Sequence, residues 1–131
     1  MRKYKAFYFA SENSVFLLMI YQNENSIDIH GELLVNELLF EKRPFIDEVP
    51  TIHSTTHPFI GEVYNKEIDI KFTGEAKSLN PDWKDPLTGL FWKGIWEDDK
   101  IIFLNSTFPD VKNMPFLLTE DEKYFLSCWL N

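Results

Sequence analysis

The chain has 131 residues, of which 44% are hydrophobic and 16% are aromatic, and its 21 acidic residues exceed its 13 basic ones for a formal net charge of −8. This length predicts a single domain spanning residues 1–131, and the apolar content excludes a disordered chain. A negative field repels nucleic-acid phosphates and anionic lipid headgroups, so we expect no nucleic-acid or membrane partner, whereas a basic protein is attracted.

The single cysteine and the N-terminal residues predict a reducing compartment. Cys128 has no second cysteine to pair with and lies in an apolar run, where a thiol behaves as a small buried hydrophobe. Residues 1–5 carry charges that lead into an aromatic segment, unlike the apolar core of an export signal. The apolar run 15–20 is far shorter than a spanning helix of about 20 residues. We therefore expect a cytoplasmic protein.

The first third of the chain predicts β-strands. Residues 4–10 are rich in aromatic side chains, and residues 15–21 are continuously apolar, as in a strand covered on both faces. From Ser26 onward apolar and polar residues alternate, and we expect this strand to form a hairpin with residues 15–21. The apolar spacing in residues 35–40 fits either a strand or one helical turn, and both remain open.

Two polar segments predict loops that could carry function. Residues 41–58 contain three prolines and the run Ser54, Thr55, Thr56, which makes them the most loop-like part of the chain. Residues 74–89 include the stretch 80–86, whose two prolines, asparagine and aspartates exclude regular structure.

Between and beyond these loops lie two predicted hairpins. Residues 67–73 alternate strictly, which predicts a half-buried strand. Asn65 and Lys66 predict a two-residue turn back to residues 59–64, because asparagine tolerates positive φ. Residues 90–96 and 100–107 flank a turn and form the second predicted hairpin, in which Gly94 indicates a bulge or a close approach of another group to the backbone.

The C-terminal residues predict a short helix. The sequence from Thr119 to Glu122 matches the capping-box pattern, and Phe125, Cys128 and Trp129 follow at helical spacing. Such a helix would lie on the sheet and close an open edge or end. The alternative is a hairpin tip at residues 119–122 between strands 116–118 and 124–129.

These segments together predict a mainly β fold. About seven or eight strands separated by turns are typical of an antiparallel barrel or sandwich. The sequential hairpins favour an up-and-down connection over a Greek key, with the short C-terminal helix added.

No pattern in the sequence predicts catalysis or a cofactor. His53 and His57 have the spacing of paired metal ligands on a helix, but Pro58 and the neighbouring Ser and Thr residues argue against a helix. We interpret them as loop histidines, exposed or capping local amides, and His30 as a residue of the polar strand face. The serines lack the glycine-flanked nucleophile elbow, and no glycine-rich phosphate loop is present. We therefore predict a protein that is not an enzyme and needs no metal or cofactor.

The predicted partner-binding residues are acidic and lie in two loops. Asp82, Trp83 and Asp85 belong to the segment 74–89, and Glu97, Asp98 and Asp99 form the turn of the second hairpin. Carboxylates accept arginine forks, and an exposed tryptophan is a common interface anchor. The alternative is that Trp83 caps the barrel and the acids are ordinary solvated turns. Glu67 and Asp69 share one strand face, where they repel each other unless a cation lies between them.

The small acidic chain, with polar loops on a β scaffold and no active-site motif, resembles bacterial toxin-immunity proteins, particularly those of contact-dependent growth inhibition systems. The resemblance implies a cytoplasmic antitoxin, an inhibitor that binds a toxin C-terminal domain, commonly a nuclease with a basic surface. It transfers no individual functional residue.

A second resemblance supports a rival function. Residues 89–96, followed by Ile101, Ile102 and Phe103, are similar to the later hairpins of calycin-type barrels. That likeness implies a carrier that holds a small apolar ligand among inward-facing side chains.

Overall fold

A computed structural model of the chain describes residues 4–22, 25–43, 46–74, 77–78, 87–106 and 111–119. All regular secondary structure within these residues is β-strand. The nine strands are β1 (Tyr4–Ala10), β2 (Ser14–Gln22), β3 (Asp28–Arg43), β4 (Ile46–Tyr64), β5 (Glu67–Phe72), β6 (Lys77–Ser78), β7 (Phe91–Glu97), β8 (Lys100–Phe103) and β9 (Pro115–Thr119).

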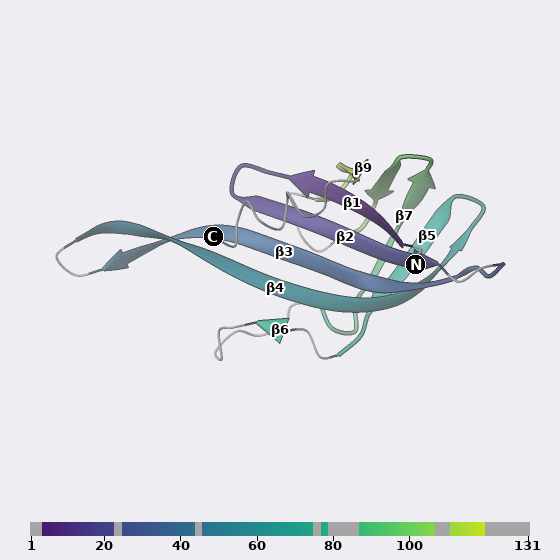
Figure 1. Cartoon of the computed structure of the whole chain (residues 1–131), viewed down its shortest axis with the longest axis horizontal. Helices are drawn as coiled ribbons and strands as arrows, with labels where there is room; N and C mark the ends of the chain where they lie inside the picture. Colours follow the sequence, from purple (N-terminus) through teal and green to yellow (C-terminus); the bar gives the residue numbers. More distant parts are fainter. Residues whose placement is uncertain are drawn as a thin grey trace.

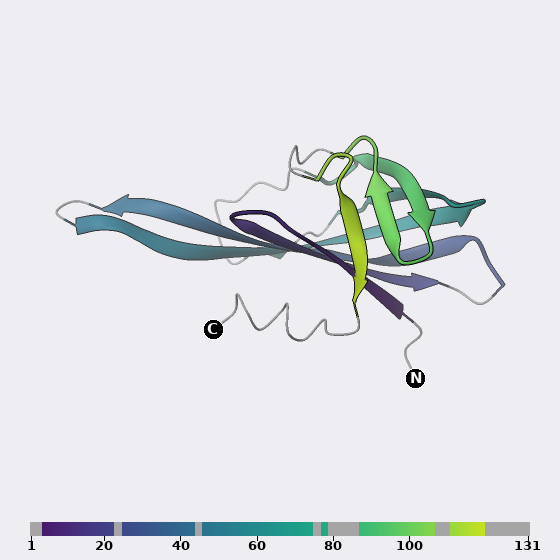
Figure 2. The same ribbon diagram turned by 90° about the horizontal axis from the view of Figure 1, so that it is seen from above.

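Eight of the strands close into an antiparallel barrel. The hydrogen-bonded order is β3-β2-β1-β9-β8-β7-β5-β4, and β3 also pairs with β4, which completes the ring. Apart from β6, which adds to β4 through two residue pairs, each strand neighbours the next one along the chain. The last strand, β9, returns beside β1, as Figure 2 shows for the yellow and purple strands. Of the barrel and the sandwich that the sequence left open, the structure therefore shows the up-and-down barrel.

Aromatic rings fill the interior of this barrel. The ring centroid of Trp92 lies 4.9 Å from that of Phe72 and 5.2 Å from that of Phe103, both edge to face. Phe103 lies 5.7 Å from Phe116, which in turn lies 5.9 Å from Phe9. Edge-to-face pairs at these distances stabilise a core beyond the burial of their area, and the inward positions of β5 supply Ile68, Ile70 and Phe72 as the alternation predicted.

The structure confirms both predicted hairpins. Asn65 and Lys66 have φ values of 49° and 70°, which is the conformation of a two-residue type I′ turn that matches the twist of the strands. In the second hairpin, a Cβ at Gly94 would lie 2.3 Å from the carbonyl oxygen of Ile102. The glycine therefore marks a close approach of the neighbouring strand, one of the two alternatives that the sequence left open.

The prediction that residues 41–58 form a loop was wrong. They belong almost entirely to β4 and the end of β3, whose pairing runs from Asp28↔Glu62 to Arg43↔Ile46. Figure 1 shows these two strands projecting from the barrel as a long ribbon. The open residues 35–40 are likewise part of β3.

Strand β4 tolerates Pro50 and Pro58 because neither position has to donate a hydrogen bond to a neighbouring described strand. Pro58 lies opposite Thr73, which follows the last residue of β5, and its carbonyl oxygen accepts the Thr73 N–H at 3.0 Å. Leu38 donates its N–H away from β4, to the Asn13 carbonyl oxygen at 2.7 Å. The Phe40↔Pro50 pair lies two positions further along and has the same orientation, so the position of the missing Pro50 N–H points away from β3, where no described strand pairs with this residue.

The predicted C-terminal helix lies outside the described residues, which end in this region with the strand Pro115–Thr119. Thr119, the expected helix cap, is the last residue of that strand. The described part of the chain holds no helix at all.

Candidate functional site

The described ends of the 74–89 segment and the turn 97–99 lie at opposite ends of the barrel. Strand β5 leads into that segment and β7 returns from it, and Gly89 donates its N–H to the Phe72 carbonyl oxygen at 2.8 Å. The turn 97–99 joins β7 to β8 at the other end, about 20 Å away along the seven residues of β7. Asp82, Trp83 and Asp85 themselves lie outside the described residues, so their role stays a prediction.

Glu97, Asp98 and Asp99, here called the acidic turn, are exposed on a fixed backbone. Asp98 has a positive φ of 49°, and its carbonyl oxygen accepts a hydrogen bond of 3.2 Å from the indole Nε1 of Trp96. The carbonyl oxygen of Asp99 accepts the N–H of Leu118 at 2.7 Å. The hydrogen bonds that fix the turn are thus made by its backbone, while the carboxylates face solvent.

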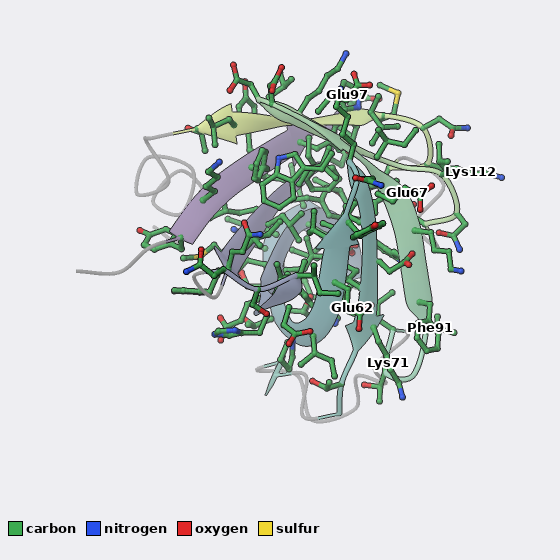
Figure 3. All side chains as sticks on the ribbon, turned by 90° about the vertical axis from the view of Figure 1, so that its right-hand side faces the viewer. Glu62, Glu67, Lys71, Phe91, Glu97 and Lys112 are labelled. Carbon is green, nitrogen blue, oxygen red and sulfur yellow. The ribbon has the colours of Figure 1, made fainter. Side chains whose placement is uncertain are left out.

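A groove that the sequence analysis did not identify lies on the outer surface of β3, β4, β5 and β7. Its volume is about 630 Å³, and it is lined by Asp28, Ile29, His30, Ile60, Gly61, Glu62, Asp69, Ile70, Lys71, Phe91 and Lys93. Figure 3 shows Glu62, Lys71 and Phe91 on this side of the barrel, on neighbouring strands. The groove is therefore built from four separate segments of the sequence, one on each strand.

One side of the groove is apolar and aromatic. Ile60 and Phe91 are each 54% exposed, and Lys71 lies between them in the strand register. The Nζ of Lys71 is 5.5 Å from the centroid of the Phe91 ring, a distance at which the cation is attracted to the ring face. Exposed large apolar side chains gathered in a hollow are typical of interaction sites.

Aromatic side chains continue this apolar side around the barrel. His30 is the register partner of Ile60 on β3, and its ring stacks on that of Tyr21 at 5.3 Å with an interplanar angle of 12°. Tyr21 in turn lies 5.3 Å from Tyr4. The prediction that His30 lies on the polar, exposed strand face is confirmed.

The other side of the groove is a line of carboxylates, here called the acidic row. Asp28, Glu62 and Asp69 lie directly opposite one another on β3, β4 and β5, and Lys93 on β7 follows in the same register. All are exposed, and among the described residues no cation lies within ion-pair distance of the three carboxylates. Like charges directly opposite on neighbouring strands repel, and Lys93 opposite Asp69 offsets only part of this charge, so the row keeps a net negative charge.

The histidines of β4 are strand residues, which corrects the prediction that both lie in a loop. His57 is 1% exposed and packs edge to face on Phe72 at 6.3 Å. Its Nε2 lies 2.8 Å from the hydroxyl oxygen of Thr55, which is also buried. His57 is therefore part of the barrel interior, and no group of three or more possible metal ligands occurs in the described ranges.

Comparisons with known proteins add no relative from which a residue role could be taken: no family model matches the chain, and no match was found among curated proteins or solved structures. No helix long and apolar enough to cross a membrane was found in the described ranges. The function is therefore inferred from the geometry of the outer surface.

Proposed function

We propose that this chain is a protein-binding module that inhibits a basic partner, and that it acts as the immunity protein of a toxin domain, most simply a nuclease. The observation that carries the proposal is the groove, where exposed Ile60 and Phe91 adjoin the carboxylates of the acidic row. Apolar anchors next to charge are the usual composition of a protein interface. Inhibition then needs only that the module cover the partner's substrate-binding surface.

The charge of the chain supports fast binding to such a partner. The formal net charge is −8, and the groove and the acidic turn expose six carboxylates on one side and one end of the barrel. A surface of one sign steers an oppositely charged partner and raises its association rate at low salt. A nuclease, whose substrate is a polyanion, presents the matching positive surface.

The packed interior favours protein binding over the rival carrier function. A carrier needs a cavity among its inward side chains, whereas here the core rings of Phe72, Trp92 and Phe103 contact one another in an unbroken chain. The groove with exposed Ile60 and Phe91 lies on the outer surface of the barrel. The carrier proposal would regain support if native mass spectrometry showed a retained small molecule.

Co-expression tests the proposal. If the chain is an immunity protein, the gene immediately upstream should encode a large secreted protein, and its C-terminal domain should co-purify with this chain and be inactive in the complex. Charge reversal in the groove, Glu62→Lys, should weaken that complex, whereas Glu12→Lys at the exposed β1–β2 turn should not. A chain that captures no such domain, or captures it without reducing its activity, would contradict the proposal.

A further inference from the structure

We infer that the occupant of the groove is an amphipathic basic helix of the partner, which lies along the acidic row and across the strands. The inference rests on the proposed protein-binding function and specifies the element that the groove recognises. Cationic side chains of the helix meet Asp28, Glu62 and Asp69, and its apolar side chains pack on Ile60 and Phe91.

The acidic row points to cationic side chains because its three carboxylates form no ion pair within the part of the chain that the structure describes. Glu62 has a carboxylate as its register partner on both sides, Asp28 on β3 and Asp69 on β5. Such pairs destabilise a sheet, and Lys93, the register partner of Asp69, leaves the repulsion between Glu62 and its two neighbours in place. A partner that supplies arginine or lysine side chains removes the repulsion and gains charge-assisted hydrogen bonds.

The spacing of the row selects a helix rather than an extended segment. Neighbouring strands are about 4.8 Å apart, so three carboxylates on adjacent strands span about 10 Å. Helix positions i, i+4 and i+7 span about 10.5 Å on one face, whereas alternate residues of an extended chain, i, i+2 and i+4, span about 13 Å. The helical pattern matches all three carboxylates at once.

The apolar side of the groove lies where the body of such a helix would rest. Ile60 is two residues from Glu62 on the same face of β4, a separation of about 7 Å. This is less than the diameter of about 10 Å of a helix with its side chains, so one helix covers both sides of the groove.

Lys93 fixes the direction of the helix. It continues the acidic row at β7 and is exposed. The complementary helix therefore carries cations at i, i+4 and i+7 and a carboxylate at i+11, which lies against Lys93. A helix bound in the opposite direction would place a cation against Lys93.

Two peptides of about 20 residues and identical composition test the inference. The first has Arg at i, i+4 and i+7, Glu at i+11 and leucines beside them on one helical face, and the second has its arginines at i, i+2 and i+4. Fluorescence anisotropy should show the first binding at least about tenfold more tightly. Tighter binding of the second peptide, or no binding of either, would overturn the inference.

Matched variants locate the binding site. Glu62→Gln should weaken the helical peptide about threefold, and the combination of Asp28→Asn, Glu62→Gln and Asp69→Asn about tenfold or more. Glu12→Gln, the same chemical change at an exposed residue of the β1–β2 turn, should change binding less than about twofold. Ile60→Ser should weaken binding without altering its salt dependence, because it removes an apolar contact. Equal effects of the Glu62 and Glu12 variants would overturn the assignment.

A measurement on the free protein tests the repulsion among the carboxylates of the acidic row, independently of any peptide. Glu62→Gln should raise the melting temperature by about 2–5 °C at low salt, and added salt should shrink the increase. An unchanged or lower melting temperature would overturn the argument from repulsion. If a partner domain co-purifies but these tests fail, only the inference about the helix is contradicted. If no partner domain co-purifies, the proposed function is contradicted.

Discussion

The indole Nε1 of Trp96 donates a hydrogen bond of 3.2 Å to the backbone carbonyl oxygen of Asp98, two residues further along the chain. The ring that makes this bond is itself held in place, because Phe7 packs on it edge to face at 5.4 Å and the Nζ of Lys5 lies 5.6 Å from its centroid. A half-buried ring that packs against the core thus holds the backbone of the acidic turn. The carboxylates of Asp98 and Asp99 have no comparable structural role, so charge and structure can be separated there.

Neutralising the acidic turn should slow partner binding without unfolding the protein. Asn tolerates the positive φ of Asp98, so the double variant Asp98→Asn/Asp99→Asn should melt within about 2 °C of the parent. Its association rate with the partner domain should fall about three- to tenfold at low salt and depend less on salt, because two steering charges are lost. Stopped-flow association at two salt concentrations measures both effects.

The variants Asp82→Asn and Asp85→Asn provide the comparison, since those residues were predicted to share the interface. The turn 97–99 and the described ends of the 74–89 segment lie at opposite ends of the barrel. If only one pair changes the association rate, the partner covers one end. An association rate that stays the same in both double variants would mean that neither loop contributes to steering.

The close strand approach at Gly61 should make this position intolerant of any side chain. A Cβ there would lie 2.1 Å from the carbonyl oxygen of Asp69, so Gly61→Ala forces the β4–β5 ladder apart. We expect a loss of about 3 kcal/mol or more in the free energy of unfolding. Urea denaturation measures it.

Gly74→Ala is the matched control. No atom of the described residues lies within 4 Å of a Cβ placed at Gly74, and its φ is not among the positive ones. The change should therefore be neutral or stabilise by up to about 1 kcal/mol, because alanine restricts the unfolded chain. Equal costs at the two glycines would show that the strand approach at Gly61 is relieved by a small shift of the backbone.

The sequence was sufficient for the strands whose pattern depends only on local alternation. The alternation of residues 67–73 predicted which side chains of β5 are buried. Asn65 and Lys66 predicted the turn that sets the pairing of β5 with β4. The first part of strand β4, residues 46–58, was missed because Pro50 and Pro58 normally exclude a strand. A proline destabilises a strand only where its missing N–H would have bonded to a neighbouring strand. Which residue faces that position depends on the tertiary pairing of the strands.

The groove could not be found from the sequence for a related reason. Alternation places Asp28, Glu62 and Asp69 on outward faces, but their alignment depends on the register of β3 against β4 and of β4 against β5. A shift of one residue would turn each side chain to the other face. Of the three carboxylates in the acidic row, only Asp69 was recognised from the sequence as close to another charge, that of Glu67 on the same strand.

The turn at Asn65 and Lys66 offers a way to stabilise the protein. Lys66 has a φ of 70°, which strains a residue with a Cβ and suits glycine. Lys66→Gly should raise the free energy of unfolding by about 0.5–1 kcal/mol. Lys66→Ala, which removes the same charge and keeps the Cβ, should give no gain, and an equal gain from both would attribute the effect to charge instead of backbone strain.

The hydrogen bond between Thr55 and His57 should contribute measurably to stability because both residues are buried. Thr55→Val keeps the shape of the side chain and removes the hydroxyl that lies 2.8 Å from His57 Nε2, so the free energy of unfolding should fall by about 1–2 kcal/mol. The neighbouring Thr56→Val, at a half-buried outward position, should cost less than about 0.5 kcal/mol. A double-mutant cycle with His57→Leu isolates the pair, since replacing both partners by apolar groups leaves no lost partner behind. The double variant should therefore cost less than the sum of the single ones, whereas additive costs would show that the contact contributes nothing to the folded state.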